Sequence, residues 1–275
     1  MEKKCNGSNE LKKKLQQIKN MLLQLAPAAI AYSGGVDSAL LLKIALDVLP
    51  QDQVTAIMAI GPMVPKSEAD FAADFAKQMG CETVTFSAEV LAVPGFVENG
   101  PKRCYFCKKY LFGNILALAE KNGCKSLLDG TNADDVHDYR PGRLALEELG
   151  IKSPFLEVGM TKEEIRELSR LYGLPTAQKP AMACLATRIP PGTAITDAAL
   201  KKVEAGEDIL KSYGLHQYRL RILGNTGRIE CLKEEMDIIR ADWDGLTEKL
   251  GGLGFAHIEL SQSGYVCGSM NRYQL

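Results

Sequence analysis

Six consecutive residues near the start of the chain combine the residue types that bind phosphate. They are Ser33-Gly34-Gly35-Val36-Asp37-Ser38, called the glycine loop from here on. Glycines let the backbone approach an anion closely, and the N–H groups of a first helical turn point at it. Ser33 and Ser38 can add hydroxyl donors, and Asp37 can hold a magnesium ion against phosphates. A plain change of chain direction is the alternative, but the apolar runs on either side favour a phosphate site.

Three cysteines have a spacing that suits a shared metal centre. Cys104 and Cys107 form a C-x-x-C motif at the start of a predicted helix, and Cys184 lies in a later, proline-rich loop. Three thiolates can hold a four-iron cluster and leave one iron open to an exogenous ligand. A redox dithiol, half of a zinc site and chance stay open as alternatives, because spacing alone does not bring three distant residues together.

The cysteine content is high for a reducing compartment. The eight are Cys5, Cys81, Cys104, Cys107, Cys124, Cys184, Cys231 and Cys267. A secreted disulfide framework is typical of a smaller, loop-rich chain, so we expect free thiols, metal ligands or catalytic groups. Cys81, Cys124 and Cys231 lie beside predicted strands, and we expect them in the core.

The composition is that of an ordinary soluble globular protein. Of the 275 residues, 46% are apolar and 24% are charged, and the formal net charge is −1. This charge provides no overall attraction to nucleic acid, and no apolar run reaches the roughly 20 residues that span a bilayer. The first residues lack the apolar core of a signal peptide. We therefore expect a cytoplasmic enzyme that binds neither nucleic acid nor membrane. The histidines show no metal-ligand spacing and are expected to be structural: His137, His216 and His257.

Hydrophobic periodicity predicts the elements that must position the glycine loop. Strands are expected at residues 28–32, 54–60, 83–86 and 126–129, and helices at 11–25, 38–48, 66–79, 105–121 and 161–172. This order predicts an α/β fold with a parallel sheet covered by helices on both faces. Ligands of such sheets bind beyond the carboxyl ends of the strands, where the glycine loop and Asp129-Gly130-Thr131 both fall. We therefore expect Asp129 and Thr131 to shape the nucleotide pocket, because Gly130 allows a tight turn at the strand end.

After about residue 196 the pattern changes to that of a small α+β unit. The expected elements are a helix at 197–213, strands at 218–223 and 228–232 with a hairpin signal between them, helices near 234–241 and 243–250, and a strand at 255–260. We predict a parallel-sheet domain at 1–180 and a linker or active-site loop at 181–195. A small domain for substrate binding or oligomerisation is predicted at 196–275.

The glycine loop resembles the PP-loop of the N-type ATP pyrophosphatases, which cleave ATP between its α- and β-phosphates. With further motifs in order, nearly the whole chain resembles the LarE family, the pyridinium-3,5-dicarboxylic acid mononucleotide sulfurtransferases. The further motifs are Arg103-Cys104-Tyr105-Phe106-Cys107-Lys108, Asp129-Gly130-Thr131-Asn132, Lys179-Pro180-Ala181, Cys184-Leu185-Ala186-Thr187-Arg188 and Gly268-Ser269-Met270-Asn271.

The resemblance implies a reaction of ATP and Mg²⁺ with a pyridinium nucleotide. A substrate carboxylate is adenylated with loss of pyrophosphate, and sulfur delivery then gives a thiocarboxylate for the nickel-pincer cofactor of lactate racemase. In single-cysteine members the residue matching Cys184 gives up its own sulfur and is consumed. Three-cysteine members, with residues matching Cys104, Cys107 and Cys184, hold a 4Fe-4S cluster. Since this chain has all three, we predict the cluster route and keep the sacrificial route as the alternative.

The resemblance also implies residues for the substrate, namely Arg188, Arg219 and Arg221. Arg219 and Arg221 alternate along a predicted strand, so both project from one face of it. Paired guanidinium groups suit a substrate that carries carboxylates and a phosphate.

Two acidic residues, Glu207 and Glu230, match family positions near the sulfur-donating cysteine. A carboxylate there can move protons, so Glu207 and Glu230 join Cys184 as predicted catalytic residues. The resemblance further implies a homo-oligomer. Two other functions stay open: a PP-loop tRNA thiolase, against which the near-neutral charge argues, and a nucleotide-binding sensor without turnover.

Overall fold

The computed structural model describes residues 2–136, 141–180 and 183–266. His137, Ala181 and the predicted motif at 268–271 therefore lie outside the described residues. The chain divides into two compact units. The first holds Met1–Gly61, Lys66–Ala88 and Cys104–Ala181, and the second holds Pro62–Pro65, Glu89–Arg103 and Met182–Leu275. The domain limits inferred from the sequence stay a prediction.

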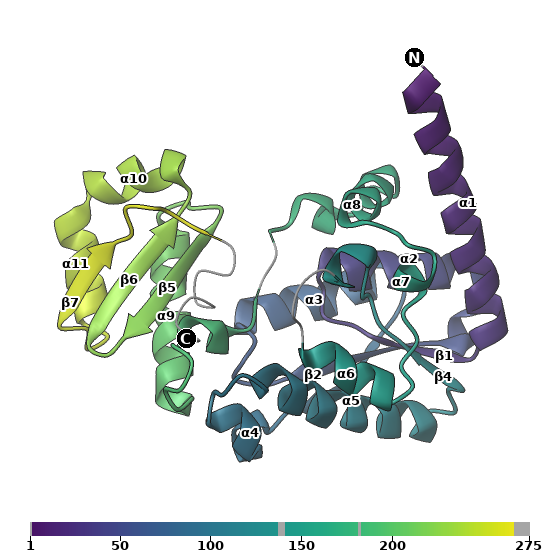
Figure 1. The fold of residues 1–275 in the computed structure, drawn as a ribbon, viewed down its shortest axis with the longest axis horizontal. Coiled ribbons are helices and arrows are strands. Elements are labelled where there is room, and N and C mark those ends of the chain that lie inside the picture. The colour runs from purple at the N-terminus through teal and green to yellow at the C-terminus, as the bar shows by residue number, and fades with distance from the viewer. Residues whose placement is uncertain (1, 137–140, 181–182, 267–275) are drawn as a thin grey trace. The chain divides into compact units, whose positions relative to one another are not determined.

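The first unit is an α/β fold built on a parallel sheet, as predicted. Its strands are β1 (Ala28–Ala31), β2 (Val54–Ile60), β3 (Thr83–Ser87) and β4 (Ser126–Leu128), in the order β3-β2-β1-β4. Its helices include α1 (Glu2–Leu25), α2 (Val36–Val48), α3 (Lys66–Gln78), α5 (Arg103–Lys121), α6 (Pro141–Glu148), α7 (Pro154–Glu157) and α8 (Lys162–Leu171). Short 3₁₀ helices are η1 (Gln51–Gln53), η3 (Ala133–Val136) and η4 (Pro175–Gln178). Figure 1 shows α2 and α5 on opposite sides of this sheet.

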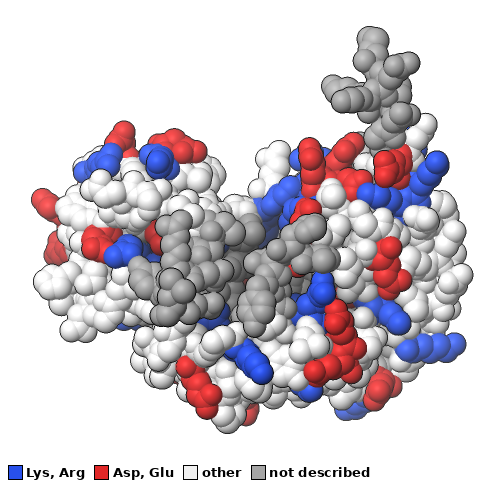
Figure 2. Space-filling view, viewed as in Figure 1, with Lys and Arg blue, Asp and Glu red and all other residues white. Residues whose placement is uncertain are grey.

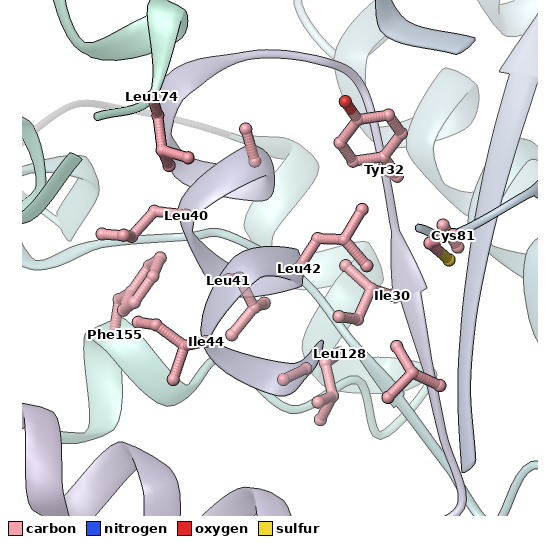
Figure 3. Packing of buried hydrophobic residues seen from close by; sticks show 14 of the residues in the cluster. Ile30, Tyr32, Leu40, Leu41, Leu42, Ile44, Cys81, Leu128, Phe155 and Leu174 are labelled. Atoms are coloured by element: carbon pink, nitrogen blue, oxygen red, sulfur yellow. The ribbon is translucent and has the colours of Figure 1, made fainter. Parts of the chain in front are cut away.

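Both faces of the parallel sheet are covered by helices. Neighbouring residues of each strand point to opposite faces, so each strand contributes to two separate clusters. Ile30 and Leu128 face α2, whose Leu40, Leu41 and Leu42 are all fully buried (Figure 3). Ala29, Ile57 and Leu127 pack instead in a cluster with Ile115 and Ala119 of α5. Burial on both faces explains why the central strands β1 and β2 are nearly continuous apolar runs, whereas the edge strand β3, Thr83–Ser87, is only partly buried.

The second unit contains a small mixed sheet. Its strands are β5 (Tyr218–Leu223), β6 (Thr226–Cys231) and β7 (His257–Leu260), with β5 and β6 antiparallel and β6 and β7 parallel. Its helices are α4 (Pro94–Val97), α9 (Asp197–Ser212), α10 (Met236–Ala241) and α11 (Trp243–Gly251), with the 3₁₀ helices η2 (Val90–Ala92), η5 (Leu185–Arg188) and η6 (Lys233–Glu235). α9 lies directly against β5, because a Cβ on Gly206 would come within 2.1 Å of Leu220 Cδ2.

Some boundaries differ from the prediction where the chain turns sharply. β6 begins at Thr226 rather than at residue 228, because the hairpin turn consists only of Gly224, at φ +60°, and Asn225. The helix predicted at 234–241 is a 3₁₀ turn followed by α10. α6 is absent from the prediction, since eight residues are too few for a clear helical period.

Within the ranges that the structure describes, no helix is both long and apolar enough to cross a membrane. On the face of the molecule in Figure 2, acidic and basic side chains of the described residues lie interspersed among neutral ones.

Candidate nucleotide site and cysteine segments

The glycine loop leaves β1 at its carboxyl end and enters α2 at Val36. Gly34 has a φ of +69°, and a Cβ there would lie 2.4 Å from the Cβ of Ala72 in α3. Only glycine fits this position, because both the backbone conformation and the contact with α3 exclude a side chain. Gly35 is the N-cap of α2 and has no side chain that could cap it, so the N–H groups of the first turn can be offered to an anion.

The two serines of the glycine loop lie within hydrogen-bond distance of each other. Their hydroxyl oxygens are 3.1 Å apart, and the Ser33 N–H donates to Ser38 Oγ over 3.2 Å. The Ser38 hydroxyl also donates to the Gly35 carbonyl over 3.3 Å. These bonds connect the two ends of the glycine loop; Ser33 is exposed, whereas Ser38 is buried.

The loop after β4 lies against the start of α2. A Cβ on Gly130 would be 2.9 Å from Asp37 Cβ and 3.0 Å from the Ser38 backbone nitrogen. Thr131 is buried, and its hydroxyl donates to Asp129 Oδ2 over 2.5 Å. The structure therefore brings Gly130 and Thr131 beside the glycine loop.

Asp37, the predicted magnesium ligand, already has two partners. Its Oδ1 accepts a hydrogen bond of 3.2 Å from Asn132 Nδ2, and its Oδ2 pairs with Lys162 Nζ. Lys162 is the first residue of α8, and its backbone N–H donates to Asp134 Oδ2 over 2.7 Å. The start of α2, the loop after β4 and the start of α8 therefore meet at the Asp37 carboxylate.

Sequence reasoning missed Lys162 and Asn132 as members of this site. Lys162 stands inside a capping box formed by Thr161 and Glu164, so its sequence context indicates only a helix start. The position of Lys162 was one available signal. A positive charge in the first turn of a helix interacts unfavourably with the helix dipole, which suggests that another contact stabilises it. Its ion pair with Asp37 is that contact.

The C-x-x-C motif lies in the first turns of α5, with Cys104 exposed and Cys107 half-buried. α6 packs beside it, because a Cβ on Gly142 would come within 3.3 Å of the Cys104 carbonyl oxygen. Glu148 of α6 accepts a hydrogen bond of 2.8 Å from the Tyr105 hydroxyl and pairs with Lys109. The hydrogen bond to Glu148 raises the pKa of Lys109. These contacts fix the start of α5 against α6.

Cys184 is half-buried and forms the N-cap of η5. Arg188, at the end of η5, is fully buried and pairs with Glu207 of α9 through two parallel hydrogen bonds of 2.8 Å each. Glu207 Oε1 also accepts the Leu220 N–H of β5 over 3.0 Å. The Cys184 segment (residues 183–188) is therefore anchored to α9, and α9 in turn to β5.

Arg219 and Arg221 project from one face of β5, as predicted, and both are buried. Arg221 donates to Glu230 Oε2 from Nε and Nη2, over 3.1 and 2.8 Å. Arg219 lies with its guanidinium carbon 5.2 Å from the centre of the Tyr265 ring. Burial lowers the pKa of Arg219, and the nearby charge of Arg188 lowers it further. Five predicted residues thus meet in the second unit: Arg188, Glu207, Arg219, Arg221 and Glu230.

Two other cysteines belong to the core rather than to a site. Cys81 and Cys231 are buried, and burial raises the pKa of both thiols, that of Cys231 to about 11. Cys124 is half-buried and packs against the cluster beneath α5. Because their pKa values are raised, the thiols of Cys81 and Cys231 stay protonated at neutral pH and are poor nucleophiles.

The three predicted cluster ligands fall in different units, Cys104 and Cys107 in the first and Cys184 in the second. Among the residues with described side chains, no group of three or more His, Cys, Asp or Glu is arranged to hold a metal ion. A shared site for these three cysteines therefore stays a prediction.

Comparison with known proteins finds relatives along nearly the whole chain. A pyridinium-3,5-bisthiocarboxylic acid mononucleotide synthase from Lactiplantibacillus plantarum is 33% identical over 250 residues, which covers 91% of either chain. An uncharacterized protein from Synechocystis is 38% identical over 264 residues, covering 95% of this chain and 98% of the relative. One from Methanocaldococcus jannaschii is 31% identical over 249 residues, or 90% of this chain and 94% of its own. No protein-family model matches the chain.

Proposed function

The chain belongs to the family of the pyridinium-3,5-bisthiocarboxylic acid mononucleotide synthase, the LarE family, and on this premise we propose that it is an ATP-dependent sulfurtransferase. It adenylates a pyridinium dicarboxylate mononucleotide and converts the carboxylate to a thiocarboxylate for the nickel-pincer cofactor of lactate racemase. The observation that carries the proposal is 33% identity with that synthase over 91% of the chain, together with a glycine loop whose geometry admits only glycine at position 34.

In the first step the glycine loop binds the phosphates of ATP. A substrate carboxylate oxygen attacks the α-phosphorus, the bond to the β-phosphate oxygen breaks, and pyrophosphate leaves. The N–H groups of the first turn of α2 and the hydroxyls of Ser33 and Ser38 stabilise the charge on the leaving pyrophosphate. Lys162 can exchange its bond with Asp37 for one with a phosphate, because that ion pair is partly exposed.

Oxygen donors at the glycine loop fit a magnesium ion. The Asp37 carboxylate supplies them, and Asn132 Nδ2 donates to its Oδ1 over 3.2 Å; Mg²⁺ binds through one or two carboxylates plus substrate phosphates. When bound, the ion neutralises phosphate charge. Asp37 would hold it, and Asn132 would orient that carboxylate.

For the second step we propose that Cys104, Cys107 and Cys184 hold an iron-sulfur cluster, which supplies sulfide when bound. The donor set fits, since three thiolates leave one iron open. A contact within the second unit supports the proposal: Arg103, which precedes Cys104 in the chain, donates to the Ala186 carbonyl, two residues beyond Cys184. Such a cluster would supply sulfide-level sulfur for attack on the adenylated carbonyl carbon; as the C–S bond forms, the C–O bond to phosphate would break and AMP would leave.

The buried residues of the second unit suit an anionic substrate. The cluster of Arg188, Arg219 and Arg221 with Glu207 and Glu230 carries a formal charge of +1, three guanidinium groups less two carboxylates; buried Glu235 lies outside this cluster and pairs with His216. We propose that this excess attracts the substrate's carboxylates and phosphate. Proton transfer by Glu207 and Glu230 stays a prediction, as do the homo-oligomer and the cytoplasmic location.

Anaerobic purification followed by turnover tests the proposal. The chain is mixed with ATP, Mg²⁺ and the pyridinium dicarboxylate mononucleotide, and pyrophosphate, thiocarboxylate, iron and acid-labile sulfide are measured. We expect pyrophosphate, thiocarboxylate and bound iron from the wild type, no iron from Cys107→Ser, and wild-type values from the control Cys124→Ser. Iron-free protein that loses the Cys184 sulfur after one turnover would establish the sacrificial route instead. Absence of pyrophosphate release would reject the proposed function.

A further inference from the structure

The backbone around Cys184 is held by side chains of the second unit. Arg188 Nη1 donates to the carbonyls of Ala183 and Cys184, over 2.8 and 3.2 Å. Arg221 Nη1 donates to the Thr187 carbonyl over 2.9 Å. One more carbonyl of the segment, that of Ala186, accepts from Arg103 Nη1 over 3.2 Å. Guanidinium groups therefore bind the backbone both before and after the cysteine.

Each of these guanidinium groups is itself fixed by an acceptor on another element. Glu207 of α9 binds Arg188 in the bidentate manner, and Glu230 of β6 binds Arg221 through one oxygen. Asn99, which follows α4, accepts from Arg103 over 2.6 Å. A guanidinium is planar and rigid, so an acceptor that holds one edge sets the direction of the remaining N–H groups.

Burial makes this arrangement stiff. The side chains of Arg188 and Glu207 are 0% and 6% exposed, and those of Arg221 and Glu230 are 5% and 6% exposed. Removing one partner leaves a buried charge, so these bonds do not exchange with water as surface pairs do. Buried carbonyls also need partners, and a short 3₁₀ helix supplies few of its own.

We propose that Arg188 and Arg221, with Arg103, are positioning residues that fix the backbone of the Cys184 segment and thereby the place of the Cys184 sulfur. The proposal rests on the proposed function for the role of Cys184, but the hydrogen bonds from the arginines to the backbone are independent of turnover. It gives Arg188 and Arg221 a task on the protein's own carbonyls, in addition to the substrate contact that the resemblance implies. Glu207 and Glu230 orient the guanidinium groups of Arg188 and Arg221 by accepting hydrogen bonds from their other N–H groups.

Hydrogen exchange of the full chain, followed by mass spectrometry of peptides spanning residues 183–189, tests whether the arginines fix the backbone of this segment. Arg188→Lys and Arg221→Lys keep the charge but lose the planar fork. We expect exchange in this segment to become about tenfold faster and thiocarboxylate formation to lose about tenfold in kcat, in addition to any rise in KM from the arginines' proposed contact with the substrate. The matched control Lys201→Gln removes an exposed ion pair of α9 and should leave exchange unchanged.

The opposite pattern would overturn the inference. If the KM rises about tenfold while exchange at 183–189 stays at the wild-type rate, the arginines serve the substrate and not the backbone. Failure of the proposed function looks different, because wild-type protein would then release no pyrophosphate while the exchange result still stands.

A milder pair of variants keeps the test valid if an arginine variant does not fold. The Thr187 hydroxyl donates to the Cys184 carbonyl over 2.8 Å and accepts from Arg188 Nη1 over 2.9 Å. Thr187→Val removes these bonds at nearly constant volume, and Thr187→Ser restores them. We expect faster exchange at 183–189 in the valine variant and recovery in the serine variant. Equal exchange in both would contradict the proposal.

Discussion

Asp37 and Lys162 pair in the first unit with side chains 22% and 33% exposed, whereas Arg188 and Glu207 pair in the second unit with side chains 0% and 6% exposed. A partly exposed pair contributes little to stability and can exchange partners. A fully buried pair cannot lose one member without leaving an uncompensated charge in the interior. The first arrangement therefore suits a site where a ligand displaces a side chain, and the second suits a site where geometry must be kept.

The largest expected effect is at the buried pair. Glu207→Ala leaves the Arg188 guanidinium buried without its carboxylate, and we expect a loss of about 3–5 kcal/mol in the free energy of unfolding. Urea denaturation measures the loss. Lys201→Gln, which breaks an exposed pair on the same helix, should change stability by less than about 0.5 kcal/mol. A similar small loss in both variants would show that burial does not make the Arg188–Glu207 pair more important for stability than the exposed pair.

Gly34→Ala comes next, because it combines a strained φ of +69° with a Cβ contact of 2.4 Å to Ala72. We expect a loss of about 2–3 kcal/mol in the free energy of unfolding and much weaker ATP binding by calorimetry. Gly150→Ala is the matched control, since Gly150 has nearly the same φ, +68°, with nothing within 4 Å. It should lose only about 1 kcal/mol, from backbone strain alone. Equal losses would mean that α3 yields to the new methyl group.

A pH-dependent effect is expected at the start of α8. Burial raises the pKa of Glu164, but the ion pair with Lys14 and hydrogen bonds from Thr161 lower it more, so the folded pKa lies below the usual value. A carboxyl with a depressed pKa stabilises the fold above its unfolded pKa of about 4.3, and the contribution is lost as the pH falls through the folded value.

Glu164→Gln should therefore cost roughly 0.5–1 kcal/mol at pH 7 and progressively less as the pH falls from about 5 to 3. Thermal denaturation across this range measures the difference between variant and wild type. Glu163→Gln, on the exposed side of the same turn, is the control for the loss of one acidic side chain from this turn. A difference that does not depend on pH would refute the assignment.

Lys162→Ala should have the smallest effect on stability, about 0.5 kcal/mol, because its ion pair is partly exposed. If Lys162 binds a phosphate as proposed, pyrophosphate release should nevertheless fall by a factor of about 100. Lys43→Ala, which removes a comparable pair with Asp47 on α2, is the control and should not change turnover. Unchanged turnover in the Lys162 variant would confine this lysine to a structural role.

The order and type of the main elements followed from local patterns. Apolar runs and helical periods predicted β2 and β5 at their observed bounds, and the glycine loop between β1 and α2 was predicted from residue types alone. Strands, helices and turns depend on residues only a few positions apart, so they can be predicted from the sequence. α6 was beyond this reasoning, since its eight residues are explained by packing on α5.

Sequence also determined that β5 presents Arg219 and Arg221 on one face, because alternation is a property of any strand. It did not determine their partners. Asp37 meets Lys162 across 125 positions of the chain, and Arg188 meets Glu207 across 19. Only the tertiary structure decided which charges are paired and which are buried, because these depend on how separate elements pack, and no local rule of the chain encodes the distance between them.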